Sequence, residues 1–191
     1  MPIPVHERRH GRGFTLIELM IVVAIVGVLA ALAVYGVRRY LLNAKTTEAR
    51  NAVGQMGKDA KTAYERESMQ STVLGIGISS RVVNNLCLDA ARPVPATIDL
   101  VTGRKYQSAP SDWLVGNSAT VGFTCLHFAV SDPQYYMYDY KGTPGESGTF
   151  AATATGDLDG NGVTSSFAIR GQVSSGTVFV SPMIEEQSPE E

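Results

Sequence analysis

The sequence predicts an α+β protein in which a long N-terminal helix packs on a C-terminal antiparallel β-sheet of about four strands. Two observations indicate the helix: residues 14–37 are predominantly apolar, and residues 38–68 continue with apolar side chains at three- and four-residue steps. A third indicates the sheet, because short β-rich segments follow one another closely from residue 121 onward. We expect the first half of the helix to span a membrane and the second half to be amphipathic.

A basic leader, residues 1–13, precedes the apolar segment and ends in Gly13. As a helix, residues 14–37 would extend roughly 36 Å, which is enough to cross a hydrocarbon core of about 30 Å with some tilt. The leader arginines favour a cytoplasmic N-terminus by the positive-inside rule, although two arginines directly after the apolar segment oppose it. An ordinary secretory signal would have a shorter apolar core followed by small residues. The pattern therefore predicts a membrane-spanning helix over residues 14–37.

Glu18 is the single charged side chain in this segment. A charged group inside a membrane helix costs about 2.5–3.5 kcal/mol near the middle and less near an end, so it usually has a partner. One interpretation is that a cation from a neighbouring subunit neutralises Glu18 as helices pack side by side. The other is that the carboxylate lies at the headgroup level or pairs within its own chain. We favour the first, because an unpaired buried charge is strongly destabilising whereas a paired one can set register.

The sequence GFTLIELMIVVAIVGVLAALAV, residues 13–34, resembles the N-terminal processing and methylation segment of type IV pilins and the related pseudopilins. The resemblance implies the pilin fold, cleavage by a prepilin peptidase between Gly13 and Phe14, and N-methylation of Phe14. It also implies that the apolar helix is retained. In that family the glutamate corresponding to Glu18 pairs with the freed α-amine of the first residue, here Phe14, in a neighbouring subunit; such an amine is a cation near pH 7.

The same resemblance implies a structural subunit of a type IV pilus filament and no enzymatic activity. Its partners would be further copies of itself, the prepilin peptidase, an inner-membrane assembly platform and minor pilins. The chain would be a single-pass inner-membrane protein before assembly and part of the extracellular pilus afterwards. Two alternatives stay open. One is a type II secretion pseudopilin or minor pilin, which shares every N-terminal feature, and the other is a membrane-anchored, calcium-stabilised binding module that never assembles.

The helical pattern continues through residues 38–68 as an amphipathic helix. Charged residues fall largely between the apolar positions, so the opposite face is expected to be solvated. Residues 69–120 are punctuated by glycine and proline and are expected to form a connecting loop region. The apolar face comprises Leu42, Ala49, Ala52, Val53, Met56, Ala60, Ala63 and Tyr64.

Residues 121–181 are expected to form the antiparallel sheet, one face of which packs on the helix. The segments that predict its strands are VGFTCLHFAV, YYMYDYKG, TFAATATGD, VTSSFAIRG and TVFVS. Residues 182–191 follow as an acidic tail that is expected to remain solvated.

Cys87 and Cys125 both lie beyond the membrane segment. If that part of the chain is exported, both cysteines enter an oxidising compartment in which disulfides persist. We expect them to form one disulfide, with Cys125 on the first strand, and two buried thiols are the alternative. Closing a loop of about 39 residues would stabilise the fold by about 4 kcal/mol in the chain-entropy model.

The segment GDLDGNG, residues 156–162, is a candidate calcium loop. Asp157, Asp159 and Asn161 alternate as oxygen ligands do in the first half of such a loop. The match then fails, because Ala168 occupies the twelfth position, where an EF-hand has its bidentate glutamate. The favoured interpretation is a hairpin turn, since Asp-Gly and Asn-Gly between alternating segments are strong turn signals.

Composition excludes several function classes. The chain has 191 residues and a net charge of −2, which gives no indication of a nucleic-acid site. No nucleophile elbow, phosphate-binding loop or zinc signature occurs in the sequence. We therefore expect no enzyme and no required cofactor, with calcium as the single candidate.

Overall fold

The computed structural model describes residues 13–66, 68–69, 76–77, 79 and 82–191. The chain divides into two compact units, Met1–Tyr40 and Leu41–Glu191. Most of the expected leader and part of the expected connecting region lie outside the described residues.

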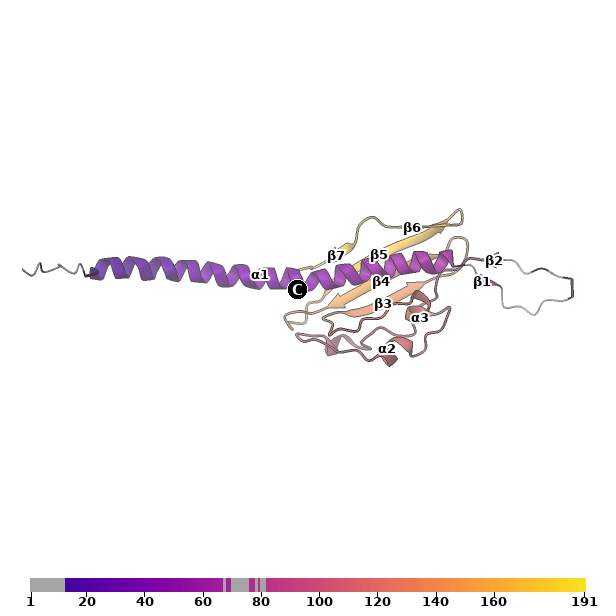
Figure 1. Cartoon of the computed structure of the whole chain (residues 1–191), viewed down its shortest axis with the longest axis horizontal. Helices are drawn as coiled ribbons and strands as arrows, with labels where there is room; N and C mark the ends of the chain where they lie inside the picture. Colours follow the sequence, from indigo (N-terminus) through magenta and orange to yellow (C-terminus); the bar gives the residue numbers. More distant parts are fainter. Residues whose placement is uncertain (1–12, 67, 70–75, 78, 80–81) are drawn as a thin grey trace, which may run out of the picture. The chain divides into compact units, whose positions relative to one another are not determined.

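The helix α1, Leu16–Glu65, has 50 residues and is the longest element (Figure 1). Within the second unit, its buried residues recur at intervals of one, three or four positions, so this part of α1 is amphipathic as predicted. The helix ends at Glu65 rather than near residue 68. Its buried residues are Thr46, Ala49, Val53, Met56, Gly57, Ala60, Ala63 and Tyr64.

The sheet is antiparallel and has five strands rather than about four. Its order is β3-β4-β5-β6, and β7 also pairs with β5. The strands are β3 (Met137–Gly142), β4 (Thr149–Gly156), β5 (Ser165–Ser174), β6 (Thr177–Val180) and β7 (Glu185–Gln187).

The inner face of the sheet packs on the second half of α1, which lies along the strands in Figure 1. Cross-strand register places Tyr138 opposite Ala154 and Ala154 opposite Phe167, and all three side chains are fully buried. Small residues on α1 allow a close approach. A Cβ added at Gly57 would lie 3.2 Å from Cγ2 of Ile169 on β5.

A partly buried polar contact also joins α1 to the start of the sheet. Oε1 of Glu48 accepts hydrogen bonds from the Tyr135 N–H (2.9 Å) and the Tyr138 hydroxyl (3.0 Å). Burial raises the pKa of Glu48, although both hydrogen bonds act in the opposite direction. Burial, together with the adjacent Glu48 charge, also raises the pKa of Tyr138.

The expected strand around Cys125 is wrong, because residues 122–126 form the helix α3, Gly122–Leu126. Both alternating sets of side chains in this segment include apolar residues, so a two-residue period did not distinguish a strand from a buried helical turn. Gly122 has a positive φ of 57°, which bends the chain where an extended strand would begin. His127, also left-handed with a φ of 62°, ends the helix.

Within the acidic tail, residues 182–191, the strand β7 pairs with β5, and all three of its residues are exposed. The remaining elements are short and precede the sheet. They are β1 (Ser68–Met69), β2 (Val82–Val83), the 3-10 helix η1 (Ile98–Leu100) and α2 (Pro110–Leu114).

Candidate assembly site

Thr15 and Glu18 close the N-terminus of α1 with a reciprocal pair of hydrogen bonds. Oε2 of Glu18 accepts from the Thr15 backbone N–H (2.9 Å) and from the Thr15 hydroxyl (2.8 Å). The Glu18 N–H donates to Oγ1 of Thr15 at 3.2 Å. This arrangement is a capping box, which satisfies two backbone donors that a helix start otherwise leaves without partners.

The capping box was not predicted, although the sequence contains its signal. Thr15 and Glu18 have the Ser/Thr-x-x-Glu spacing that defines the motif. In the isolated chain, Glu18 therefore has a partner within its own chain, as one of the two interpretations of this residue anticipated. The other interpretation, pairing between subunits, requires a second copy.

Gly13 and Phe14, the residues of the expected cleavage junction, precede the helix and have no regular secondary structure. The Phe14 side chain is 86% exposed, and a Cβ added at Gly13 would meet nothing within 4 Å. The junction is therefore an accessible peptide next to the capped helix start.

The first part of α1 presents apolar side chains around its whole circumference. Residues such as Leu19, Val23 and Leu29 are each about 60% exposed, as a helix surrounded by lipid or by other helices would be. The helix is long and apolar enough to cross a membrane. A signal sequence near an N-terminus meets the same criteria of length and composition.

The disulfide between Cys87 and Cys125 is present, with the two Cα atoms 5.8 Å apart and a sequence separation of 38. Cys87 is fully buried, and Cys125 lies in α3 rather than on a strand. The bond therefore joins the segment before η1 to the helix before the sheet. Within the loop that it closes lies Trp113, which packs edge-on against Phe123 at a centroid distance of 5.0 Å.

The oxygens of the candidate calcium loop accept hydrogen bonds from the loop itself. The Asp157 carboxylate accepts from the N–H groups of Gly160 (2.7 Å) and Gly162 (3.0 Å). Asp159 accepts from Asn161, whose own Oδ1 accepts from the Val163 N–H at 2.6 Å. The bonds from Asn161 to Asp159 and from Val163 to Asn161 reach two residues along the chain and are those of Asx turns. Within the described residues, no group of three or more His, Cys, Asp or Glu side chains is arranged to hold a metal.

A family model described as "Prokaryotic N-terminal methylation motif" matches residues 8–34 of this chain. That range contains the Gly13–Phe14 junction, the capping box and the apolar start of α1. An apolar N-terminal helix that carries this motif, followed by an antiparallel sheet, defines the class of pilin-like proteins.

The relatives found by comparison are pilins and fimbrial proteins. Fimbrial protein EcpC of Eikenella corrodens is 38% identical over 85 residues, which are 42% of this chain and 56% of that protein. Type IV major alpha-pilin of Moraxella bovis is 40% identical over 76 residues, which are 36% and 48% of the two chains. Type IV major fimbrial protein FimA of Dichelobacter nodosus is 49% identical over 54 residues, or 28% and 32%.

These three matches span between 32% and 56% of the length of the relatives. The N-terminal part of the chain is therefore similar to type IV pilins and fimbrial proteins. None of the three names is that of an enzyme. No solved structure matches the chain.

Proposed function

We propose that this protein is the structural subunit of a type IV pilus filament. The observation that carries the proposal is a methylation motif placed directly before a helix whose first part exposes apolar side chains on all sides. Such a helix needs either lipid or other helices around it. When the subunit leaves the membrane, the core of a filament surrounds the helix with the helices of other subunits. The relatives named as major pilins favour this function over that of a pseudopilin or minor pilin.

Processing is the first step of the proposal. A prepilin peptidase would cut between Gly13 and Phe14, and Phe14 would become the N-methylated first residue. The exposure of this peptide supports the step, because a protease needs an accessible backbone outside regular secondary structure. The remaining helix would hold the subunit in the inner membrane until an assembly platform, with minor pilins, moves it into a filament on the cell surface.

Assembly is the second step. The freed amine of Phe14 in one subunit would pair with the carboxylate of Glu18 in a neighbour. The Thr15 hydrogen bonds support this role because both go to one oxygen, Oε2, and hold the carboxylate at the helix start. A group whose orientation is already fixed loses less freedom when it binds.

Two substitutions of Glu18 separate pairing from capping. Glu18→Ala removes both the charge and the acceptor of the capping box, whereas Glu18→Gln keeps an acceptor oxygen for Thr15 and removes only the charge. We expect both variants to be processed normally and to give at least about tenfold fewer filaments in the sheared fraction. Losing about 1.4 kcal/mol at each Glu18–Phe14 contact between subunits is enough to change the assembly equilibrium tenfold. Filament yield is measured by electron microscopy and immunoblotting of the sheared fraction.

The outcomes of this experiment are distinct. Normal filaments from Glu18→Gln but not from Glu18→Ala would assign the role of Glu18 to capping within one chain and refute the intersubunit pair. Gly13→Leu serves as the processing control and should leave the leader attached. Intact-mass and N-terminal analysis of the sheared fraction reports cleavage and methylation. Mature protein from the Gly13→Leu variant would contradict the proposed junction.

Calcium is not part of the proposed function. The N–H groups that bond to Asp157 and Asp159 support a structural turn in GDLDGNG. Ala168, in place of the bidentate glutamate of a calcium loop, disfavours a calcium-stabilised binding module. Abundance distinguishes the remaining alternative, since a major pilin dominates sheared filaments and a pseudopilin does not.

A further inference from the structure

The residues after β6 return to the sheet and pair with the part of β5 that β6 does not cover. β6 pairs with residues 171–174 of β5, and β7 pairs with residues 166–168 along the same strand. We call residues 185–191 the C-terminal strap. Every residue of β7 is exposed, so burial of apolar surface contributes little to holding it.

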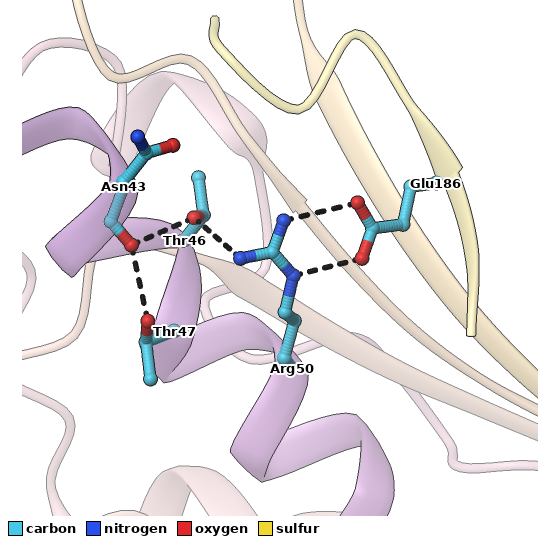
Figure 2. A network of polar contacts seen from close by, with 5 residues as sticks. All are labelled: Asn43, Thr46, Thr47, Arg50 and Glu186. Carbon is cyan, nitrogen blue, oxygen red and sulfur yellow. Dashed lines mark hydrogen bonds and ion pairs between the residues drawn. The ribbon is translucent and has the colours of Figure 1, made fainter. Parts of the chain in front are cut away.

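An ion pair joins the strap to α1. The Arg50 guanidinium donates from Nε and Nη2 to the two carboxylate oxygens of Glu186, at 2.7 and 3.0 Å (Figure 2). Its third nitrogen, Nη1, donates to the buried Thr46 hydroxyl at 3.1 Å, and that hydroxyl in turn donates to the Asn43 carbonyl. A parallel two-bond pair of this kind is stronger and more directional than a single surface contact.

Further polar contacts fasten the strap on both sides of Glu186. Glu185 accepts from Nε of Arg170 on β5, at 3.1 and 3.2 Å to its two oxygens. Farther along, the Asn161 amide donates to Oε2 of Glu191 at 2.9 Å, which ties the strap to the Asx turn before β5. The strap is thus held by carboxylates that reach three different elements of the unit.

We propose that the C-terminal strap is an ionic latch, which opens as a unit at low pH or high salt and uncovers the edge of β5 at residues 166–168. Each of these side-chain contacts uses a carboxylate, so loss of those charges weakens them together, and the two arginine pairs lose the most. The three backbone pairs of β7 alone form too short a strand to remain in place without them. An uncovered edge presents backbone N–H and C=O groups to which another strand can add.

The sign of the pH dependence follows from the groups around each carboxylate. Glu186 faces Arg50 on α1, which also lies over the Phe167 ring and near Tyr136, while Glu185 faces Arg170 on β5. The hydrogen bond from Arg50 lowers the pKa of Glu186. A lowered carboxyl pKa means that the latch is fully closed above the ordinary glutamate value and opens as pH falls through the lowered one.

Hydrogen exchange of the full-length protein in detergent micelles tests the latch, with mass spectrometry resolving the peptide that contains β7. In Glu186→Gln, amides of β7 should exchange about tenfold faster at neutral pH, while those of β3 and β4 keep their rates. Glu146→Gln is the matched control: it removes the same charge from an exposed residue outside the strap and should change neither region. Added salt should speed β7 exchange in the wild-type protein and much less in Glu186→Gln.

Exchanging the two charges of the ion pair distinguishes loss of the pair from misfolding of the variant. Arg50→Glu combined with Glu186→Arg should recover most of the protection that Arg50→Glu alone loses. Unchanged exchange of β7 in Glu186→Gln would overturn the proposal. Equal acceleration of all core peptides would overturn it as well, because the pair would then stabilise the whole unit rather than a strap that opens separately.

Discussion

At the residue scale, Phe150 and Gly171 face each other across β4 and β5. The Phe150 ring folds over Gly171, and a Cβ added at Gly171 would overlap Cε1 and Cζ of that ring. The ring also stacks on Tyr140, so it cannot move freely. Gly171→Ala should therefore lower the free energy of unfolding by about 1–3 kcal/mol through overpacking.

Gly54→Ala is the matched control, because a Cβ added at Gly54 meets nothing within 4 Å and the residue lies inside α1. It should raise stability by up to about 1 kcal/mol. Urea unfolding followed by Trp113 fluorescence measures both variants, since the chain has a single tryptophan and it is buried. Equal effects of the two substitutions would argue against the packing of Phe150 on Gly171.

At the element scale, side-chain periodicity decided which predictions succeeded. The second half of α1 was predictable because its apolar residues recur on one face and its charged residues fall between them. The helix α3 was not, because apolar side chains around Cys125 fit both a strand and a short helix. The strand β7 was not predictable either: its glutamates carry no apolar pattern, and the partner of Glu186 on α1 lies more than 100 residues away.

The GDLDGNG turn gives a prediction at the same scale. Hydrogen bonds to Asp157 and Asp159 already hold the turn without a metal, and Ala168 stands where a calcium loop has its bidentate glutamate. We expect the thermal unfolding temperature of the full-length protein to be the same with excess calcium and with EDTA. An increase with calcium would demonstrate binding to the folded state, since a ligand stabilises by RT ln(1 + [L]/Kd).

At the scale of the whole molecule, the disulfide closes a large loop within the Leu41–Glu191 unit. Replacing both cysteines by alanine should lower the free energy of unfolding by up to about 4 kcal/mol, because the unfolded chain regains the entropy of that loop. Urea unfolding measured by Trp113 fluorescence is again suitable, since Trp113 lies inside the loop. A loss below about 1 kcal/mol would show that the chain-entropy account does not apply here.

Only part of the candidate assembly site could be predicted from the sequence. Gly13, Phe14 and Glu18 could be selected from sequence because a motif of fixed order contains them. The local partner of Glu18 could also have been found, since Thr15 is three residues before it. An intersubunit pair has no such signal within one chain, so its existence depends on the filament experiments.

The attachment of the strap bears on how the protein should be labelled. A purification tag or fluorophore attached at Glu191 would perturb the segment whose carboxylates contact Arg50, Arg170 and Asn161, and so would disturb the strap itself. An insertion between Gly145 and Glu146 is the better choice. Both residues are exposed in the turn between β3 and β4, and a Cβ at Gly145 would meet open space.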